Sequence, residues 1–192
     1  MSYTIPKPTI PPRVVPKAKT ASTSMPGSEI LLTRNGIELS MRPIALADAP
    51  ALVRAFAHLT PEQVRMRLFS NLSALPIEVA RQLCDVNPER IAAFVVTKPG
   101  DSEILAEARI VADRSAALAE FAIVVDPEWT SIGIAQALMT RLIAESRDRG
   151  LIEIWGDVLA DNRSMLDLVQ RLGFERHPHV GDHSVVRASL AL

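Results

Sequence analysis

The sequence predicts an α/β fold of the α+β kind, in which a mixed, mostly antiparallel central sheet carries helices on both faces. Three successive apolar stretches between residues 91 and 125 no longer follow the helical period, and residues 103–112 alternate between apolar and charged positions, which predicts neighbouring strands. Before and after these stretches the apolar period is 3.6, which predicts helices. The length of 192 residues suits one domain with a full core.

The ends of that domain follow from a change in composition. Residues 1–28 hold six prolines among polar residues, which is typical of an extended, disordered tail. We therefore expect a single globular domain over residues 29–192. Because the tail is basic, docking on an acidic patch or a partner is an alternative to a solvated arm.

The first half of the domain begins with an alternating strand, "IELSMRPI", at residues 37–44. A helix follows at residues 47–59. A second helix is expected to begin after Thr60, with Pro61 at its first position and Gln63 completing a capping box. A third short helix begins at Pro76.

The second half begins with strands at residues 91–97, 103–112 and 117–125, joined by turns as an antiparallel meander. A helix then runs to a stop at Gly150. A strand at residues 152–159 precedes a helix that Asp161 is expected to cap and Gly173 to end. The last strand covers residues 184–192.

Charge and composition exclude several classes of partner. The net charge of −1 argues against nucleic acid and anionic membranes, because both need a concentrated basic surface. No apolar run approaches the roughly 20 residues of a membrane span, and the N-terminal stretch lacks the apolar core of a secretory signal. A single cysteine, Cys84, fits a reducing, cytoplasmic compartment. We expect Cys84 to be a core residue rather than a reactive thiol.

The stretch "WTSIGIAQALM", residues 129–139, is the first candidate for chemistry. It joins a strand to a helix, and Gly133 and Ala135 are small where helix amides would approach an anion. Tight packing of this helix on the sheet explains the same two residues equally well. The neighbouring side chains, Thr130 and Ile132, carry no charge.

Glu120 is the second candidate, because it is a carboxylate inside an apolar strand. By alternation it shares a face with Leu118, Ala122 and Val124, and therefore lies on a poorly covered patch or points into a cleft. Partial burial would raise its pKa toward that of a general base. The alternative is an edge-facing glutamate paired with a surface arginine.

Two further polar features have simple structural explanations. Asn162 lies at the start of a predicted helix, where it either caps the helix or contacts a ligand through its amide. His177, His179 and His183, with Asp182, have a spacing that resembles a zinc site, but no cysteine supports it. We expect a Pro-Gly loop there and no metal.

Taken together, the element order and three stretches resemble the GNAT superfamily of acyl-CoA-dependent N-acyltransferases. The resemblance covers residues 37–192 and is closest to the GNAT domain of bacterial protein-lysine acetyltransferases. Its carrying stretches are "MRPIALADAPALVRAFAHLTPEQVRMRLFS", "AEFAIVVDPEWTSIGIAQALMTRLIAESRDRG" and "VLADNRSMLDLVQRLGF". It implies a GNAT-like sheet, acetyl-CoA or another short acyl-CoA as co-substrate, an amine acceptor such as a protein lysine, and a possible homodimer.

The resemblance also implies roles for single residues. Glu120 matches the family's general base, acting directly or through water, and an amide near Val124 would stabilise the oxyanion. The family's acyl-CoA loop reads Gln/Arg-x-x-Gly-x-Gly/Ala, and Gly133 and Ala135 take its small positions. The implied cofactor-binding residues are Val124 and Val125 at the pantetheine arm, Thr130, Ser131, Ile132, Gly133, Ile134, Ala135 and Gln136 at the pyrophosphate, and Asn162 at the pantetheine.

Three departures from the family pattern keep other functions open. Thr130 and Ile132 stand where the family has Gln or Arg, and Val169 stands where a tyrosine often protonates the leaving thiolate. The expected activity is acyl transfer to a primary amine by direct attack. The alternatives are a small-molecule amine acetyltransferase and a non-catalytic acyl-CoA-binding or regulatory module.

Overall fold

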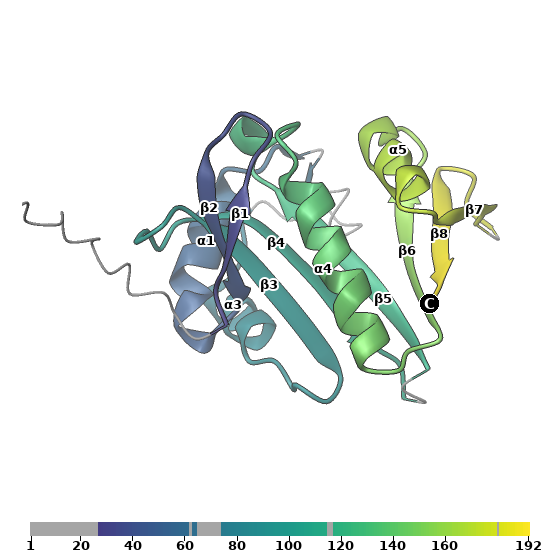
Figure 1. Cartoon of the computed structure of the whole chain (residues 1–192), viewed down its shortest axis with the longest axis horizontal. Helices are drawn as coiled ribbons and strands as arrows, with labels where there is room; N and C mark the ends of the chain where they lie inside the picture. Colours follow the sequence, from purple (N-terminus) through teal and green to yellow (C-terminus); the bar gives the residue numbers. More distant parts are fainter. Residues whose placement is uncertain (1–26, 62, 65–73, 115–116, 180) are drawn as a thin grey trace, which may run out of the picture.

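The computed structural model describes residues 27–61, 63–64, 74–114, 117–179 and 181–192. Within them, eight strands form one sheet in the order β1-β2-β3-β4-β5-β6-β8-β7, and β5 and β6 run parallel while the other pairs are antiparallel (Figure 1). This confirms the predicted mixed sheet. The strands are β1 (Glu29–Leu32), β2 (Glu38–Pro43), β3 (Ile91–Thr97), β4 (Ile104–Ala112), β5 (Leu118–Val125), β6 (Glu153–Leu159), β7 (Glu175–Pro178) and β8 (Val185–Ala191).

Helices cover both faces of this sheet, as predicted. On one face, α1 (Ala49–Ala57) and α3 (Ile77–Cys84) bury an apolar cluster against β3 and β4. On the other, α4 (Ile134–Asp148) and α5 (Arg163–Arg171) bury a larger cluster. Strand β3 serves both layers because its side chains alternate, with Phe94 in the larger cluster and Val95 in the smaller one.

Most elements with strong periodicity lie where the sequence predicts them. The predicted capping box is also present, since Thr60 N donates to Gln63 Oε1 (3.0 Å) and Gln63 N donates to Thr60 Oγ1 (3.2 Å). Most of the helix expected beyond it lies outside the described residues. Cys84 is a core residue, and burial raises the pKa of its thiol to about 11.

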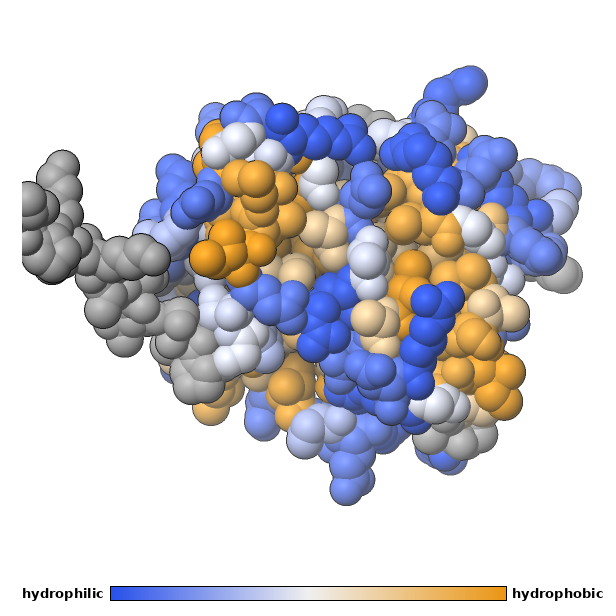
Figure 2. All heavy atoms as spheres, viewed as in Figure 1, coloured by the Kyte–Doolittle hydropathy of each residue, from blue (hydrophilic) through white to orange (hydrophobic). Residues whose placement is uncertain are grey.

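Both edge strands were absent from the prediction. The sequence predicts the first strand at residues 37–44 and a loop at residues 176–183, whereas β1 and β7 are the two outer strands of the sheet. Their side chains are mostly exposed, so neither carries a buried alternating face that a sequence pattern would reveal. Ile30 and Leu32 of β1 are exposed, and Figure 2 shows apolar side chains gathered over this strand.

The sheet opens between its two parallel strands. β5 and β6 pair over only three residues each, from Leu118 opposite Glu153 to Glu120 opposite Trp155. Just beyond, Gly156 lies under the Phe121 ring, whose nearest atom would be 2.6 Å from any added Cβ. A glycine is therefore required where the two strands begin to diverge.

Candidate active site

A cavity of about 840 Å³ occupies the gap between the diverging strands. It is bordered by β5, by the loop and first turn of α4, by the end of β6 and by the start of α5. The sequence-predicted site residues that line it are Glu120, Val124, Val125, Thr130, Ser131, Gly133, Ala135, Gln136 and Asn162. Residues from four separate elements thus meet at one space.

Ile132 and Ile134 are the two predicted site residues that do not line the cavity. Ile134 is 1% exposed within the larger apolar cluster, and Ile132 packs against the same cluster. Their side chains anchor the loop to the core, so only their backbone groups are available to a ligand.

The first turn of α4 offers unpaired donors. Gly133 precedes the helix with φ 102°, which favours glycine, and Ser131 has φ 65°. The first helical bond runs from Ala137 N to Gly133 O, which leaves the amides of Ile134, Ala135 and Gln136 without a helical acceptor. Because Gly133 has no side chain to cap them, these N–H groups and the helix dipole favour an anion here.

The backbone of β5 requires a correction at Val124. Asp126 N donates to Leu105 O across the β4–β5 ladder, whose register is continuous. Because backbone groups of successive strand residues point to opposite edges, Val124 turns its N–H and C=O toward β4. The predicted oxyanion amide and open backbone at Val124 are therefore wrong. Ile123 and Val125 are the residues whose backbone faces the gap.

The backbone of Val125 is only partly open. Gln63 Nε2 donates to Val125 O (3.0 Å), so this carbonyl already has a partner. Gln63 also lines the cavity, and sequence reasoning identified it only as a capping residue. The same side chain therefore links the start of a helix to the gap beside β5.

Glu120 lies at the last paired position before the gap, opposite Val111 of β4 and Trp155 of β6. It lines the cavity and its side chain is exposed rather than partly buried. On β8, the strand on the other side of β6, Arg187 donates two hydrogen bonds of 2.9 Å to Asp157. Those bonds raise the pKa of Arg187, and Glu120 contributes to the same shift by its charge.

Asn162, rather than Asp161, is the N-cap of α5. Its Oδ1 accepts from Met165 N (3.2 Å) and from Ser164 Oγ (3.1 Å). The cap uses the oxygen of the amide, while Asn162 also lines the cavity. Val169, at the position of the family's tyrosine, is fully buried in the apolar core.

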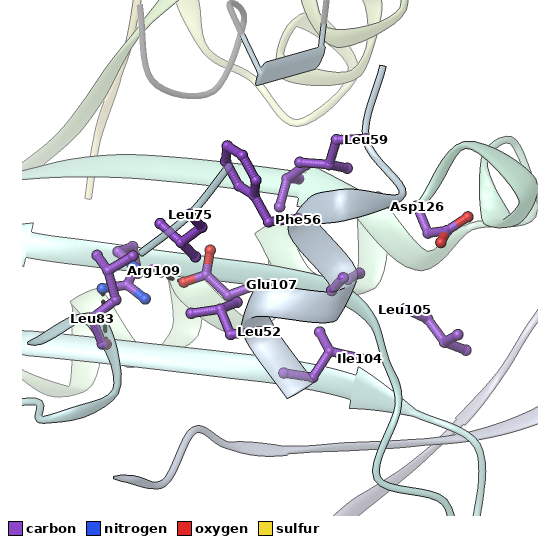
Figure 3. A pocket seen from close by; sticks show the side chains of 13 residues that line it. Leu52, Phe56, Leu59, Leu75, Leu83, Ile104, Leu105, Glu107, Arg109 and Asp126 are labelled. Atoms are coloured by element: carbon purple, nitrogen blue, oxygen red, sulfur yellow. Dashed lines mark hydrogen bonds and ion pairs between the residues drawn. The ribbon is translucent and has the colours of Figure 1, made fainter. Parts of the chain in front are cut away.

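A second, smaller pocket of about 50 Å³ lies between α1 and the sheet (Figure 3). Its walls are mainly apolar, but Glu107 and Arg109 of β4 form a buried ion pair in it, with 2.5 Å between Arg109 Nε and Glu107 Oε1. Arg109 Nη1 also donates to Leu83 O (3.2 Å). Both side chains lie on the face of β4 that α1 and α3 cover.

The residues that the structure describes contain no group of three or more His, Cys, Asp and Glu side chains arranged to hold a metal ion. None of the helices described there is long and apolar enough to cross a membrane. His177, predicted to lie in a loop, is part of β7.

The sequence model of the acetyltransferase (GNAT) family matches residues 60–174. The chain is also similar to the ribosomal protein bS18-alanine N-acetyltransferase of Escherichia coli K12, at 34% identity over 86 residues. That match covers 45% of this chain and 56% of the relative, so the chain spans just over half of the relative's length.

Solved structures share the fold. The GNAT domain of S. lividans PAT matches with a TM-score of 0.78 and 24% identity, covering 86% of this chain and 97% of that one. The yncA protein of Salmonella typhimurium, solved with its cofactor acetyl-CoA, matches with a TM-score of 0.66 and 18% identity, covering 80% and 94%.

Proposed function

The chain belongs to the acetyltransferase (GNAT) family, and we propose that it transfers an acetyl or short acyl group from acyl-CoA to a primary amine. The observation that carries this proposal is the cavity between β5 and β6. It brings together the uncapped amides of α4, the partly open backbone edge of β5 and the Glu120 carboxylate. A thioester donor needs the first two features, and an amine nucleophile needs the third.

The cofactor would lie along the gap. The amides of Ile134, Ala135 and Gln136 would hold the pyrophosphate. The pantetheine arm would pair with the gap-facing backbone of Ile123 and with the N–H of Val125. Asn162 keeps its Nδ2 free of the cap and is the side chain we assign to the pantetheine. The relative solved with acetyl-CoA supports this choice of co-substrate.

The reaction would proceed by direct attack. Glu120, directly or through a water, takes a proton from the ammonium form of the acceptor, and the neutral amine attacks the thioester carbonyl carbon. A gap-facing amide of β5 stabilises the oxyanion of the tetrahedral intermediate. The C–N bond forms on attack, and the C–S bond breaks as the tetrahedral intermediate collapses. The CoA thiolate leaves, and the remaining extra proton on the nitrogen passes through water to the thiolate sulfur.

The acceptor we favour is an amine of a protein. The relative of E. coli is named for acetylating an alanine of a ribosomal protein, and the S. lividans relative is the GNAT domain of PAT. An exposed Glu120 at the rim of a wide cavity is accessible to a protein chain as well as to a small amine. A panel of a peptide with a free N-terminal alanine, a blocked peptide with one internal lysine and a small polyamine would rank the acceptors.

Glu120→Gln tests the proposed base. Removing the carboxylate should lower kcat/KM for the best acceptor by roughly 10²- to 10⁴-fold while the Kd for acetyl-CoA stays within about twofold. The matched control is Glu153→Gln, which removes the same charge from the adjacent strand outside the cavity lining. Wild-type activity in Glu120→Gln would refute the assigned base. Acetyl-CoA binding without transfer to any acceptor would favour the non-catalytic binding module.

A further inference from the structure

The proposed pyrophosphate loop lacks a cation of its own. Thr130 and Ile132 are uncharged, and the side chain of Ile132 packs against the core. Without a cation, the backbone amides alone would have to bind the pyrophosphate, which carries at least two negative charges. A nearby guanidinium would add charge-assisted hydrogen bonds, which are roughly twice as strong as neutral ones.

Arg34, in the turn between β1 and β2, lies against this loop. Its backbone N donates to Ile132 O (2.9 Å), and its Nη2 donates to Gln136 Oε1 (2.9 Å) in the first turn of α4. Its Cγ would be 3.5 Å from a Cβ on Gly133. Arg34 lines the cavity together with Thr130, Gln136 and Gly133, so its side chain lies beside the loop that precedes α4.

The turn that carries Arg34 is held firmly. Thr33 is buried, and its Oγ1 donates to Asn35 Oδ1 (2.6 Å) and accepts from Ile37 N (2.9 Å) across the turn. Further along the hairpin, Arg141 of α4 pairs with Glu29 of β1 (3.1 Å). The β1–β2 hairpin is thus tied to α4 at two points, which sets the position of Arg34 relative to the helix start (Figure 1).

The charge of Arg34 is available to a ligand. Among the described residues, no carboxylate lies within ion-pair distance of its guanidinium, whose hydrogen bond goes to the neutral amide of Gln136. Arg141, Arg149 and Arg187 differ, because each is paired with a carboxylate. Arg34 is also exposed, so an anion can reach it without displacing an ion-pair partner.

We infer that Arg34 is the phosphate-binding cation of the cofactor site, supplied by the β1–β2 hairpin instead of by the loop before α4. This inference rests on the proposed function, because it assumes that acyl-CoA occupies the cavity. The guanidinium and the amides of Ile134 to Gln136 would contact the pyrophosphate from two sides. Acyl donors without phosphates should not depend on Arg34.

The test is titration calorimetry with acetyl-CoA on wild type, Arg34→Ala and Arg34→Lys. We expect Arg34→Ala to weaken acetyl-CoA binding about ten- to a hundredfold. Arg34→Lys should recover part of this loss, because lysine keeps the positive charge but lacks the several N–H donors of a guanidinium. Arg147→Ala is the matched control, since it removes an exposed arginine from the far end of α4. Thermal unfolding of each variant confirms that it is folded.

Truncated donors locate the contact. With dephospho-CoA, which lacks the 3′-phosphate, the loss caused by Arg34→Ala should persist. With S-acetylpantetheine, which lacks all phosphates, transfer rates of wild type and Arg34→Ala should be equal. A loss that disappears with dephospho-CoA would overturn the pyrophosphate assignment, and equal acetyl-CoA binding by wild type and folded Arg34→Ala would overturn the inference. Absence of binding to wild type would instead refute the proposed function.

Discussion

The two helices that border the cavity begin in opposite ways. Helix α4 follows Gly133, which has a left-handed backbone and no side chain, so its first amides have no cap. Helix α5 follows Asn162, whose Oδ1 accepts from Met165 N. One helix start is open to a ligand, while the other has satisfied one of its donors with its own chain.

This difference separates two kinds of ligand contact. At α4 the backbone and the helix dipole attract negative charge, and Arg34 adds a cation. At α5 the cap uses the Oδ1 of Asn162, a residue that lines the cavity, and leaves its Nδ2 available as a donor. We therefore expect the phosphates of an acyl donor at α4 and its neutral pantetheine at α5. Substitutions at the two helix starts should then affect binding and stability differently.

The largest effect is expected from Gly133→Glu. A carboxylate at the uncapped start of α4 would occupy the anion site and pair with Arg34, so acetyl-CoA binding measured by calorimetry should weaken more than about a hundredfold. Gly150→Glu is the control for backbone strain, because Gly150 also has positive φ but lies in open space beyond the end of α4. Equal binding by Gly133→Glu and wild type would show that α4 does not hold the cofactor.

A smaller effect is expected from Asn162→Ala, and mainly on stability. Removing the cap should lower the free energy of unfolding by about 1 kcal/mol, measured by urea denaturation. Loss of the amide should also weaken acetyl-CoA binding by roughly two- to tenfold, the range of a neutral hydrogen bond. An unchanged unfolding free energy would mean that the cap contributes nothing to α5.

The smallest effect on stability is expected from Asn162→Ser, which separates cap from ligand contact. Serine caps helices about as well as asparagine, so the free energy of unfolding should change by only a few tenths of a kcal/mol. The serine lacks the Nδ2 donor, and acetyl-CoA binding should therefore weaken as much as in Asn162→Ala. Wild-type affinity in Asn162→Ser would assign Asn162 to capping alone.

The parts of the fold that the sequence predicts are those with a buried face. The strands β3 and β4 are buried along almost their whole length, while β5 and α4 bury apolar residues mainly on one side, and these apolar runs and periods are visible in a single sequence. The edge strands β1 and β7 bury little, and their stability comes from pairing with β2 and β8. Because Arg34 lies in the turn between β1 and β2, a sequence pattern that does not predict β1 also gives no indication that Arg34 lies beside α4.

The candidate site divides in the same way. Gly133 and Asn162 act through the backbone of the next few residues, so their helix-starting roles follow from local chemistry. The backbone direction at Val124 depends on the register of β4 and β5, which no local pattern specifies. The sequence left the exposure of Glu120 open for a related reason, since the exposure of a side chain depends on which elements cover it.

By itself, the sequence determined the helices, the central strands and the small-residue loop before α4, because each depends on residues only a few positions apart. The tertiary structure alone decided that β5 and β6 diverge after three pairs and that Arg34 reaches Gln136, 102 residues away along the chain. Short-range propensity sets where an element begins and ends. The packing of a whole sheet sets which charges meet, because contacts between distant elements form only when all their neighbours are in place.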